Sequence, residues 1–154
     1  MKTDSAAYLS DAIRRIEGGN VSSSSGSHVA GIFGKAAKAF EKEFRMHVSW
    51  TLKTCGLDYD TNLRATIKGT AFQKLTLGNL MAVIKKASTL NSQFVPACLP
   101  EGYEFSGFLD AVKQINDAWV QVKHGDEVEA QILVTRMKSM LELLQRIRTQ
   151  EKLG

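Results

Sequence analysis

The stretch VAGIFGKAAKAFEKEFRMHVSWTLKT, residues 29–54, decides the fold class, because it carries the strongest helical pattern in the chain. At about 100° per residue, apolar side chains collect on one side of this segment and cations on another. Gly56 follows it as a C-terminal cap. We therefore predict one long amphipathic helix. The side expected to be buried comprises Ile32, Phe33, Ala36, Phe40, Phe44, His47 and Thr51.

Helical spacing also recurs along the rest of the chain. Thr76 is suited to N-cap a helix, and apolar residues three and four positions apart fill residues 105–122. Residues 57–74 are less regular and predict an ordered loop or a short helix around residues 62–67. Neither β-alternation nor an internal repeat is present, so the predicted fold is an all-α bundle of four to five helices. Its other helices are expected over residues 4–17, 77–90, 105–122 and 127–150.

The size and composition indicate an ordinary globular protein. The chain has 154 residues, of which 44% are hydrophobic and 23% are charged. This length is enough for one domain with its own core. We predict a single domain over residues 1–154, with a flexible loop at 18–28 and a charged tail at 148–154.

The sequence contains no signal for membrane insertion, metal binding or a cofactor. The amino-terminal residues lack an apolar signal-peptide core, and no apolar run reaches the ~18 residues of a membrane span. Cys55 and Cys98 are expected to be free thiols in a reducing cytoplasm. The net charge of +4 is compatible with a polyanionic partner but does not require one.

The motif INDAWVQVKHGD, residues 115–126, points to a family. It resembles the Leu-Asn-x-x-Arg-Asn-x-x-x-His-Gly stretch of HEPN domains, helical domains named for higher eukaryotes and prokaryotes nucleotide binding. Ile115, Asn116, His124 and Gly125 fall on matching positions. The upstream segments LTLGNLMAVIKKA and FGKAAKAFEKEFRMHV occur in the same order as similar segments of that family. The resemblance covers residues 29–147 and implies a HEPN-like helical domain.

The same resemblance implies that the catalytic motif of this chain is incomplete. Active members are metal-independent ribonucleases with an arginine five to seven positions before the motif histidine. Those positions hold Asp117, Ala118 and Trp119 in this chain, and Val120 replaces the polar residue that follows the arginine. A histidine can remove the proton of the RNA 2′-hydroxyl, but a cation must also stabilise the charge on the phosphate. The candidate catalytic residues are therefore His124, with Asn116 and Lys123.

Two interpretations of His124 remain open. It falls in the last turn before Gly125, where a polar or cationic side chain meets the exposed carbonyls of a helix end. This structural interpretation is favoured over catalysis. Similarly, Asn116 is expected to fix helix register or a dimer seam, and His47 to be a core or interface histidine. The helix over 105–122 is expected to pair two copies, through Phe108, Val112, Ile115 and Trp119.

The cationic side of residues 29–54 is a candidate nucleic-acid surface. Lys35, Lys38, Lys42 and Arg45 share this side at helical spacing, although the sequence slightly favours an ordinary solvated helix face over a phosphate-binding one. Aromatic residues are not interleaved with these cations, which argues against a base-stacking platform. Gly31 and Gly34 are expected to permit close packing near the helix start.

Two functions follow from these observations. The first is a non-catalytic HEPN-like interaction or regulatory module, dimeric or bound to a partner protein. An RNA is a further expected partner, and a bacterial or phage conflict, defence or toxin–antitoxin system is the expected setting. The second is a metal-independent endoribonuclease that uses His124. The missing arginine favours the first.

Overall fold

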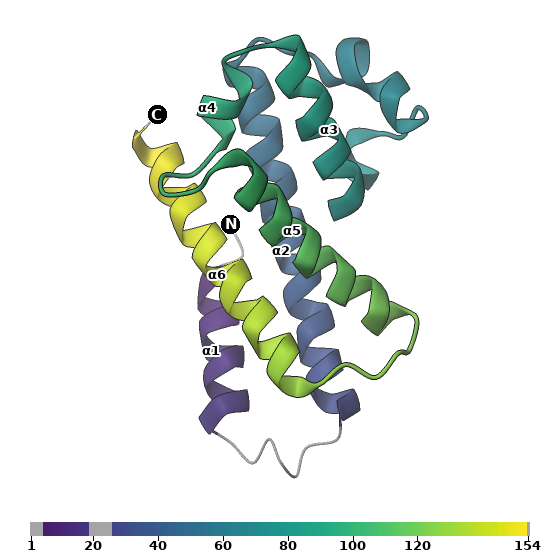
Figure 1. Cartoon of the computed structure of the whole chain (residues 1–154), viewed down its shortest axis with the longest axis vertical. Helices are drawn as coiled ribbons and strands as arrows, with labels where there is room; N and C mark the ends of the chain where they lie inside the picture. Colours follow the sequence, from purple (N-terminus) through teal and green to yellow (C-terminus); the bar gives the residue numbers. More distant parts are fainter. Residues whose placement is uncertain (1–4, 19–25, 154) are drawn as a thin grey trace. The chain divides into compact units, whose positions relative to one another are not determined.

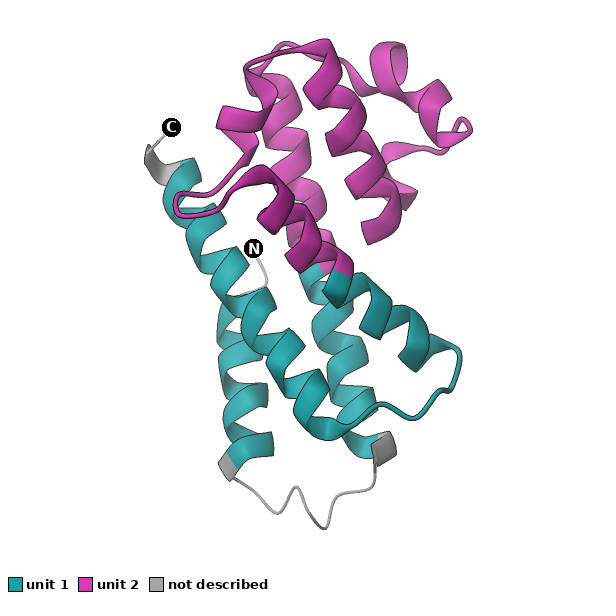
Figure 2. Cartoon of the chain, in the orientation of Figure 1, with its two compact units in different colours: residues 1–40, 114–154 teal, residues 41–113 magenta. Residues whose placement is uncertain are grey.

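The computed structural model describes residues 5–18 and 26–153, and every regular element in these ranges is helical (Figure 1). The all-α class is therefore confirmed. The chain divides into two compact units, residues 1–40 with 114–154 and residues 41–113 (Figure 2). Both division points fall inside helices and not in a linker, where boundaries between separate domains usually lie. The single-domain prediction therefore stays a prediction.

The elements are more numerous than a bundle of four to five helices. The described residues contain six α-helices and three short helical turns. The α-helices are α1 (Ser5–Gly18), α2 (Gly26–Thr54), α3 (Leu77–Leu90), α4 (Phe94–Cys98), α5 (Phe105–Lys123) and α6 (Ala130–Leu153). The turns are η2 (Tyr59–Leu63), η3 (Arg64–Ile67) and η4 (Phe72–Lys74).

Several expected boundaries need correction. The predicted loop at 18–28 is too long at both ends, because α1 includes Gly18 and α2 begins at Gly26, while residues 19–25 lie outside the described residues. The predicted charged tail at 148–154 is helical through Leu153, because α6 continues with good helix formers to that point. The helix α4 is not among the predicted helices, and Pro96 is its third residue. Proline is tolerated in the first turn of a helix, where its missing N–H has no intrahelical partner.

The first unit is built on α1 and α6, which lie side by side (Figure 1). Both helices bury an apolar stripe, and an exposed ion pair of 2.8 Å joins Lys138 to Glu17 between them. The amino-terminal part of α2 and the carboxyl-terminal part of α5 complete this unit. Its buried side chains include Leu9, Ile13, Ile16, Phe33, Trp119, Met137, Met140 and Leu144.

The second unit is built on the remainder of α2, with α3, α4 and the first half of α5. Phe44 and Phe108 pack with their ring centroids 5.9 Å apart, and Tyr103 meets Phe108 edge-on at 6.2 Å. In α2, the side expected to be buried is buried at every position except Ile32, which is half-buried. That side therefore supplies core residues along the whole helix.

The segment between α2 and α3 is ordered by its own polar contacts. Gly56 ends α2 with φ +71°, and Leu57 N donates to Leu52 O at 2.9 Å, as expected of a C-terminal glycine cap. Asp58 accepts from Thr61 N at 2.9 Å and begins η2. These hydrogen bonds lower the pKa of the Asp58 carboxyl. The short helix considered around residues 62–67 is present as two short helical turns, η2 and η3, and the rest of the segment is an ordered loop that contains η4.

Candidate functional site

Backbone hydrogen bonds close the carboxyl end of α5, where the motif histidine lies. His124 N donates to Val120 O at 3.0 Å, and Gly125 N donates to Val122 O at 3.1 Å. Asp126 N reaches back to Gln121 O at 3.0 Å. Gly125 has φ +80°, a conformation that favours glycine, so it ends the helix as the sequence predicts. His124 is therefore the last residue before the glycine that stops α5.

The His124 side chain is exposed. Within the described part of the chain, its imidazole forms no hydrogen bond or ion pair. The predicted position at a helix end is correct. The predicted contact between this side chain and the terminal carbonyls is not formed, because Gly125 and Asp126 supply backbone donors to that end.

Trp119 occupies one of the positions where the HEPN resemblance places an arginine. Its side chain is 8% exposed and packs against α2. The Phe33 ring lies 6.4 Å from the Trp119 ring, centroid to centroid. A Cβ atom added to Gly34 would lie 3.1 Å from Trp119 Cζ3, so the glycine permits this approach. The close-packing prediction is thus confirmed for Gly34 and wrong for Gly31, where a Cβ atom would meet nothing within 4 Å.

Lys123 does not replace the missing arginine in this arrangement. Its Nζ lies 4.9 Å from the centroid of the Trp119 ring, one turn earlier on α5. Such an ammonium is held by the negative face of the indole, an interaction that contributes about 0.5–1 kcal/mol at exposed sites. The cation nearest to His124 in sequence is therefore engaged by the same tryptophan that displaces the expected arginine.

Asn116 lies apart from the other two candidate catalytic residues. It is half-buried and precedes His124 by eight residues, a rise of about 12 Å along a helix. Within one chain, α5 therefore does not bring Asn116, Lys123 and His124 around a common reacting atom.

The side chains expected at a dimer interface are instead part of the core. Phe108, Val112 and Ile115 have no exposed surface, and Trp119 is 8% exposed. The assignment of these four residues to an interface is corrected accordingly, because a fully buried side chain offers no surface to a second copy. The apolar spacing over residues 105–122 is satisfied within the chain itself. Dimerisation stays a prediction and would have to use other residues.

The cationic side of α2 separates into two kinds of residue. Lys35, Lys38 and Lys42 are exposed, in agreement with a solvent-facing role. Arg45 is not, because only 16% of its side chain is exposed. The assignment of Arg45 to a nucleic-acid surface is therefore corrected: it is a structural residue of the second unit.

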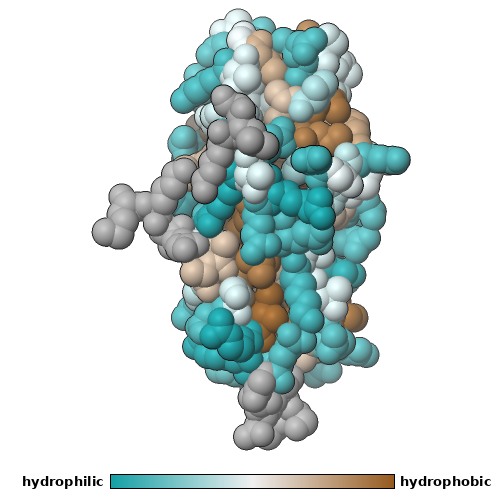
Figure 3. Space-filling view, turned by 90° about the vertical axis from the view of Figure 1, so that its left-hand side faces the viewer, coloured by the Kyte–Doolittle hydropathy of each residue, from teal (hydrophilic) through white to brown (hydrophobic). Residues whose placement is uncertain are grey.

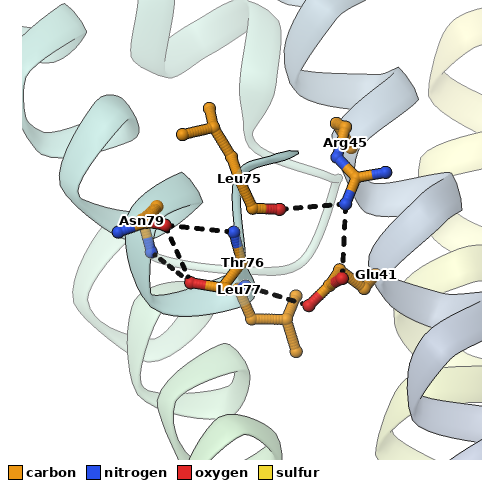
Figure 4. Close-up of polar contacts among 6 residues, drawn as sticks. All are labelled: Glu41, Arg45, Leu75, Thr76, Leu77 and Asn79. Carbon is orange, nitrogen blue, oxygen red and sulfur yellow. Dashed lines mark hydrogen bonds and ion pairs between the residues drawn. The ribbon is translucent and has the colours of Figure 1, made fainter. Parts of the chain in front are cut away.

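Arg45 and Glu41 connect α2 to the start of α3 (Figure 4). Arg45 Nη2 lies 3.2 Å from Glu41 Oε1 and donates to Leu75 O at 2.9 Å. The other carboxylate oxygen, Glu41 Oε2, accepts from Leu77 N at 3.3 Å. A carboxylate beside these amides also interacts favourably with the positive end of the helix dipole. Sequence reasoning missed Glu41, although its position four residues before Arg45 suggested an ion pair.

Thr76 completes the start of α3. Its Oγ1 accepts from Asn79 N at 3.2 Å, and Asn79 Oδ1 accepts from Thr76 N at 3.2 Å (Figure 4). This reciprocal capping box confirms the predicted N-cap. The polar side chains at this helix end are thus occupied by structural hydrogen bonds.

His47 and the two cysteines also have structural surroundings. The buried His47 ring lies with Nε2 2.8 Å from Cys98 O, which confirms a core position for this histidine. Both cysteines are free thiols, as predicted. Burial, and to a smaller degree Cys98, raises the pKa of the Cys55 thiol, which disfavours the reactive thiolate. Across residues 5–18 and 26–153, no group of three or more His, Cys, Asp or Glu side chains is arranged to hold a metal ion.

None of the described helices has the length and apolar character needed to cross a membrane. On the face drawn in Figure 3, hydrophilic residues predominate and hydrophobic residues form separate patches. Comparison of the chain with models of known protein families, with curated proteins and with solved structures gave no match.

Proposed function

We propose that this chain is a non-catalytic, HEPN-like interaction or regulatory module. The observation that carries the proposal is the burial of Trp119, on Phe33 and Gly34, at a position where the resembling family has a catalytic arginine. The module acts in the cytoplasm, as a homodimer or as a subunit bound to a partner protein, and associates with RNA. By family analogy its setting is a bacterial or phage conflict, defence or toxin–antitoxin system.

The requirements of RNA cleavage support the non-catalytic assignment. Without a metal, the reaction needs a base for the 2′-hydroxyl and a cation for the developing phosphate charge. His124 offers an accessible base, but Lys123 Nζ is held over the Trp119 ring. The larger, electrostatic part of the catalysis therefore has no residue in a suitable position on α5.

The alternative is a metal-independent endoribonuclease that uses His124. The exposure of this imidazole beside the end of α5 favours it, because a substrate could reach the ring. A basic residue of a second copy would then replace the arginine, and Asn116 and Lys123 would position the RNA. This alternative needs an assembly that brings two α5 ends together.

Incubation of the purified protein with varied RNAs in EDTA tests both functions. We expect no cleavage by the wild type or by His124→Ala. The control is His28→Ala, which removes another exposed histidine. Cleavage by wild type and His28→Ala that is lost in His124→Ala would establish the nuclease and overturn our proposal. Cleavage that persists in all three proteins would exclude His124 as the base and contradict the proposed alternative; its loss on further purification would then identify a contaminating ribonuclease.

The interaction role has a separate test. Sedimentation equilibrium over a range of concentrations measures self-association, and affinity capture of the tagged chain under matched conditions detects a partner protein. A homodimer, or a partner that co-purifies in a fixed ratio, is the expected result. A protein that stays monomeric and captures no partner in a fixed ratio contradicts the proposal.

A further inference from the structure

We infer that Lys35, Lys38 and Lys42 of α2, here called the lysine stripe, bind the phosphate backbone of a nucleic acid without reading its sequence. This inference deepens the proposed association with RNA, on which it rests, by naming the surface and the kind of contact that would make it. The surface excludes Arg45 and does not use the end of α5.

The spacing of the lysine stripe is set by one helix. Lys35 and Lys38 are three residues apart, and Lys38 and Lys42 are four apart, so they rise by about 4.5 and 6 Å along the axis. Residues three and four apart lie on the same side of a helix. All three side chains are exposed. The stripe therefore presents three ammonium groups from consecutive turns of α2.

None of the three lysines forms an ion pair or a hydrogen bond with a described residue. Arginines elsewhere pair with a carboxylate four residues earlier, as in Asp11–Arg15 and Glu142–Arg146. The residues four positions before Lys35, Lys38 and Lys42 are Gly31, Gly34 and Lys38, so this partner is absent from the stripe.

One carboxylate does lie within reach in sequence, three residues after Lys38. It is Glu41, but its two oxygens are taken by Arg45 and by Leu77 N. Lys38 and Lys42 are moreover like charges four residues apart, a pair that destabilises a helix by about 0.2–0.5 kcal/mol. A helix face that carries unneutralised like charges at a small cost in stability is suited to an external polyanion.

The composition of this face favours nucleic acid over an acidic protein. Protein interfaces are depleted in lysine and centre on tryptophan, tyrosine or arginine. Between the stripe residues the helix carries three alanines, the core residue Phe40 and Glu41, whose carboxylate is engaged by Arg45 and Leu77 N. Lysine is a compact point charge that neutralises single phosphates, and such contacts position nucleic acids without specifying sequence. Because Phe40 is buried, the stripe offers no aromatic side chain on which bases could stack.

The salt dependence of the binding affinity gives a quantitative expectation for the lysine stripe. Each phosphate neutralised on a duplex contributes about −0.9 to the slope of log affinity against log salt, and about −0.7 on a single strand. Three lysines therefore account for about −2 to −3 of the slope. Loss of each contact should make the slope shallower by about one and weaken binding uniformly across sequences.

The test measures fluorescence anisotropy of labelled duplex DNA and single-stranded RNA, each of two unrelated sequences, between about 50 and 200 mM salt. The test variant reverses Lys35, Lys38 and Lys42 to glutamate, and a second variant replaces them with glutamine. The matched control reverses Lys74, Lys85 and Lys86, three exposed lysines outside α2. Because both reversals change the net charge equally, a difference between them reports the surface and not the overall charge. Far-UV circular dichroism checks that each variant is folded.

We expect the glutamate variant to lose at least about tenfold in affinity on both sequences and to have a slope shallower by two to three. The glutamine variant should lose less, and the Lys74/Lys85/Lys86 control should bind nearly as the wild type does. Comparison of the duplex and single-strand arms identifies which form is preferred.

Three outcomes overturn the inference: no nucleic-acid binding by the wild type, equal loss in the control, or equally tight binding of labelled polyglutamate. The last would assign the stripe to acidic proteins. Each of these results leaves the oligomer and partner measurements of the proposed function unaffected, so the two failures can be told apart.

Discussion

The start of α3 and the end of α5 are both helix ends rich in polar residues, but they are closed by different means. At the start of α3, side chains close the helix: Thr76 and Asn79 cap it, and Glu41 reaches in from α2. At the end of α5, backbone amides close the helix, and the His124 side chain is left exposed. A polar side chain with a structural task is thus unavailable for chemistry, whereas one beside a glycine cap remains accessible.

The comparison extends to the cations beside each helix end. Arg45 is fixed by Glu41 and by Leu75 O, and Lys123 Nζ lies over the Trp119 ring. Both were candidates for function from their charge and spacing. The contact with Leu75 O, distant in sequence, makes Arg45 a structural residue, and Trp119, one turn earlier on α5, engages the Lys123 ammonium. Charge at a helical position therefore indicates a function only when the neighbours leave it unpaired.

The largest expected effect concerns the packing that supports the end of α5. Trp119→Ala removes a nearly buried indole from Phe33 and Gly34 and should lower the free energy of unfolding by about 3–5 kcal/mol. Urea unfolding followed by far-UV circular dichroism measures it. His124→Ala is the control and should change stability by less than about 0.5 kcal/mol, since its ring is exposed. Equal losses in the two variants would show that His124 also has a structural role.

Arg45→Met tests whether side chains hold the start of α3. It removes the charged donor to Glu41 and Leu75 while keeping an apolar stem of similar length. Since hydrogen bonds to charged groups contribute about 1.5–3 kcal/mol, we expect a loss of that size in urea unfolding. Lys42→Met, at an exposed position on the same helix, should be nearly neutral. If Lys42→Met costs as much as Arg45→Met, the distinction between the two cations fails.

Two glycines on α2 test how closely α5 packs there. Gly34→Ala places a Cβ atom 3.1 Å from Trp119 Cζ3, and such overpacking costs about 1–3 kcal/mol. Because Trp119 is nearly buried and packs on Phe33, its ring has little room to shift, so we expect this cost to outweigh the gain of about 1 kcal/mol in helix propensity. Gly31→Ala meets nothing within 4 Å and should stabilise the protein by up to about 1 kcal/mol. Thermal unfolding of the pair measures the opposite signs, and stabilisation by both variants would contradict the close approach.

The smallest expected effect is on the pH dependence of stability, and it distinguishes the charged N-cap Asp58 of η2 from the neutral N-cap Thr76 of α3. The hydrogen bonds from Thr61 lower the pKa of Asp58 below the ordinary value of about 3.9. A lowered pKa in the folded state stabilises the protein above the unfolded pKa, and this contribution is lost as the pH falls through the folded pKa. NMR titration of Asp58 should show the lowered value, and Asp58→Asn should remove that part of the acid dependence. Thr76→Ser, at the neutral cap of α3, should leave the pH dependence unchanged.

The helices were predictable because their signals are local. Periodicity identified α2, α3 and α5 within a few residues, and the glycine caps at Gly56 and Gly125 gave correct ends. The helix α4 was missed because Pro96 is equally consistent with a loop and with a first helical turn. The candidate site was only partly predictable: the position of His124 at a helix end is a local property, but its exposure depends on which groups cap that end.

The sequence by itself determined that this protein is all-α, that Thr76 begins a helix and that Gly125 ends one, because these features depend on neighbours a few residues away. Only the tertiary structure decided the roles of the residues between them. In the folded chain Phe108, Val112 and Ile115 are buried, Arg45 donates to Leu75 O, and Trp119 packs against Gly34. An apolar stripe or a cation has the same spacing whether it faces the core, a partner or solvent. Contacts between segments distant in sequence distinguish these cases, and such contacts cannot be predicted from the periodicity of one helix.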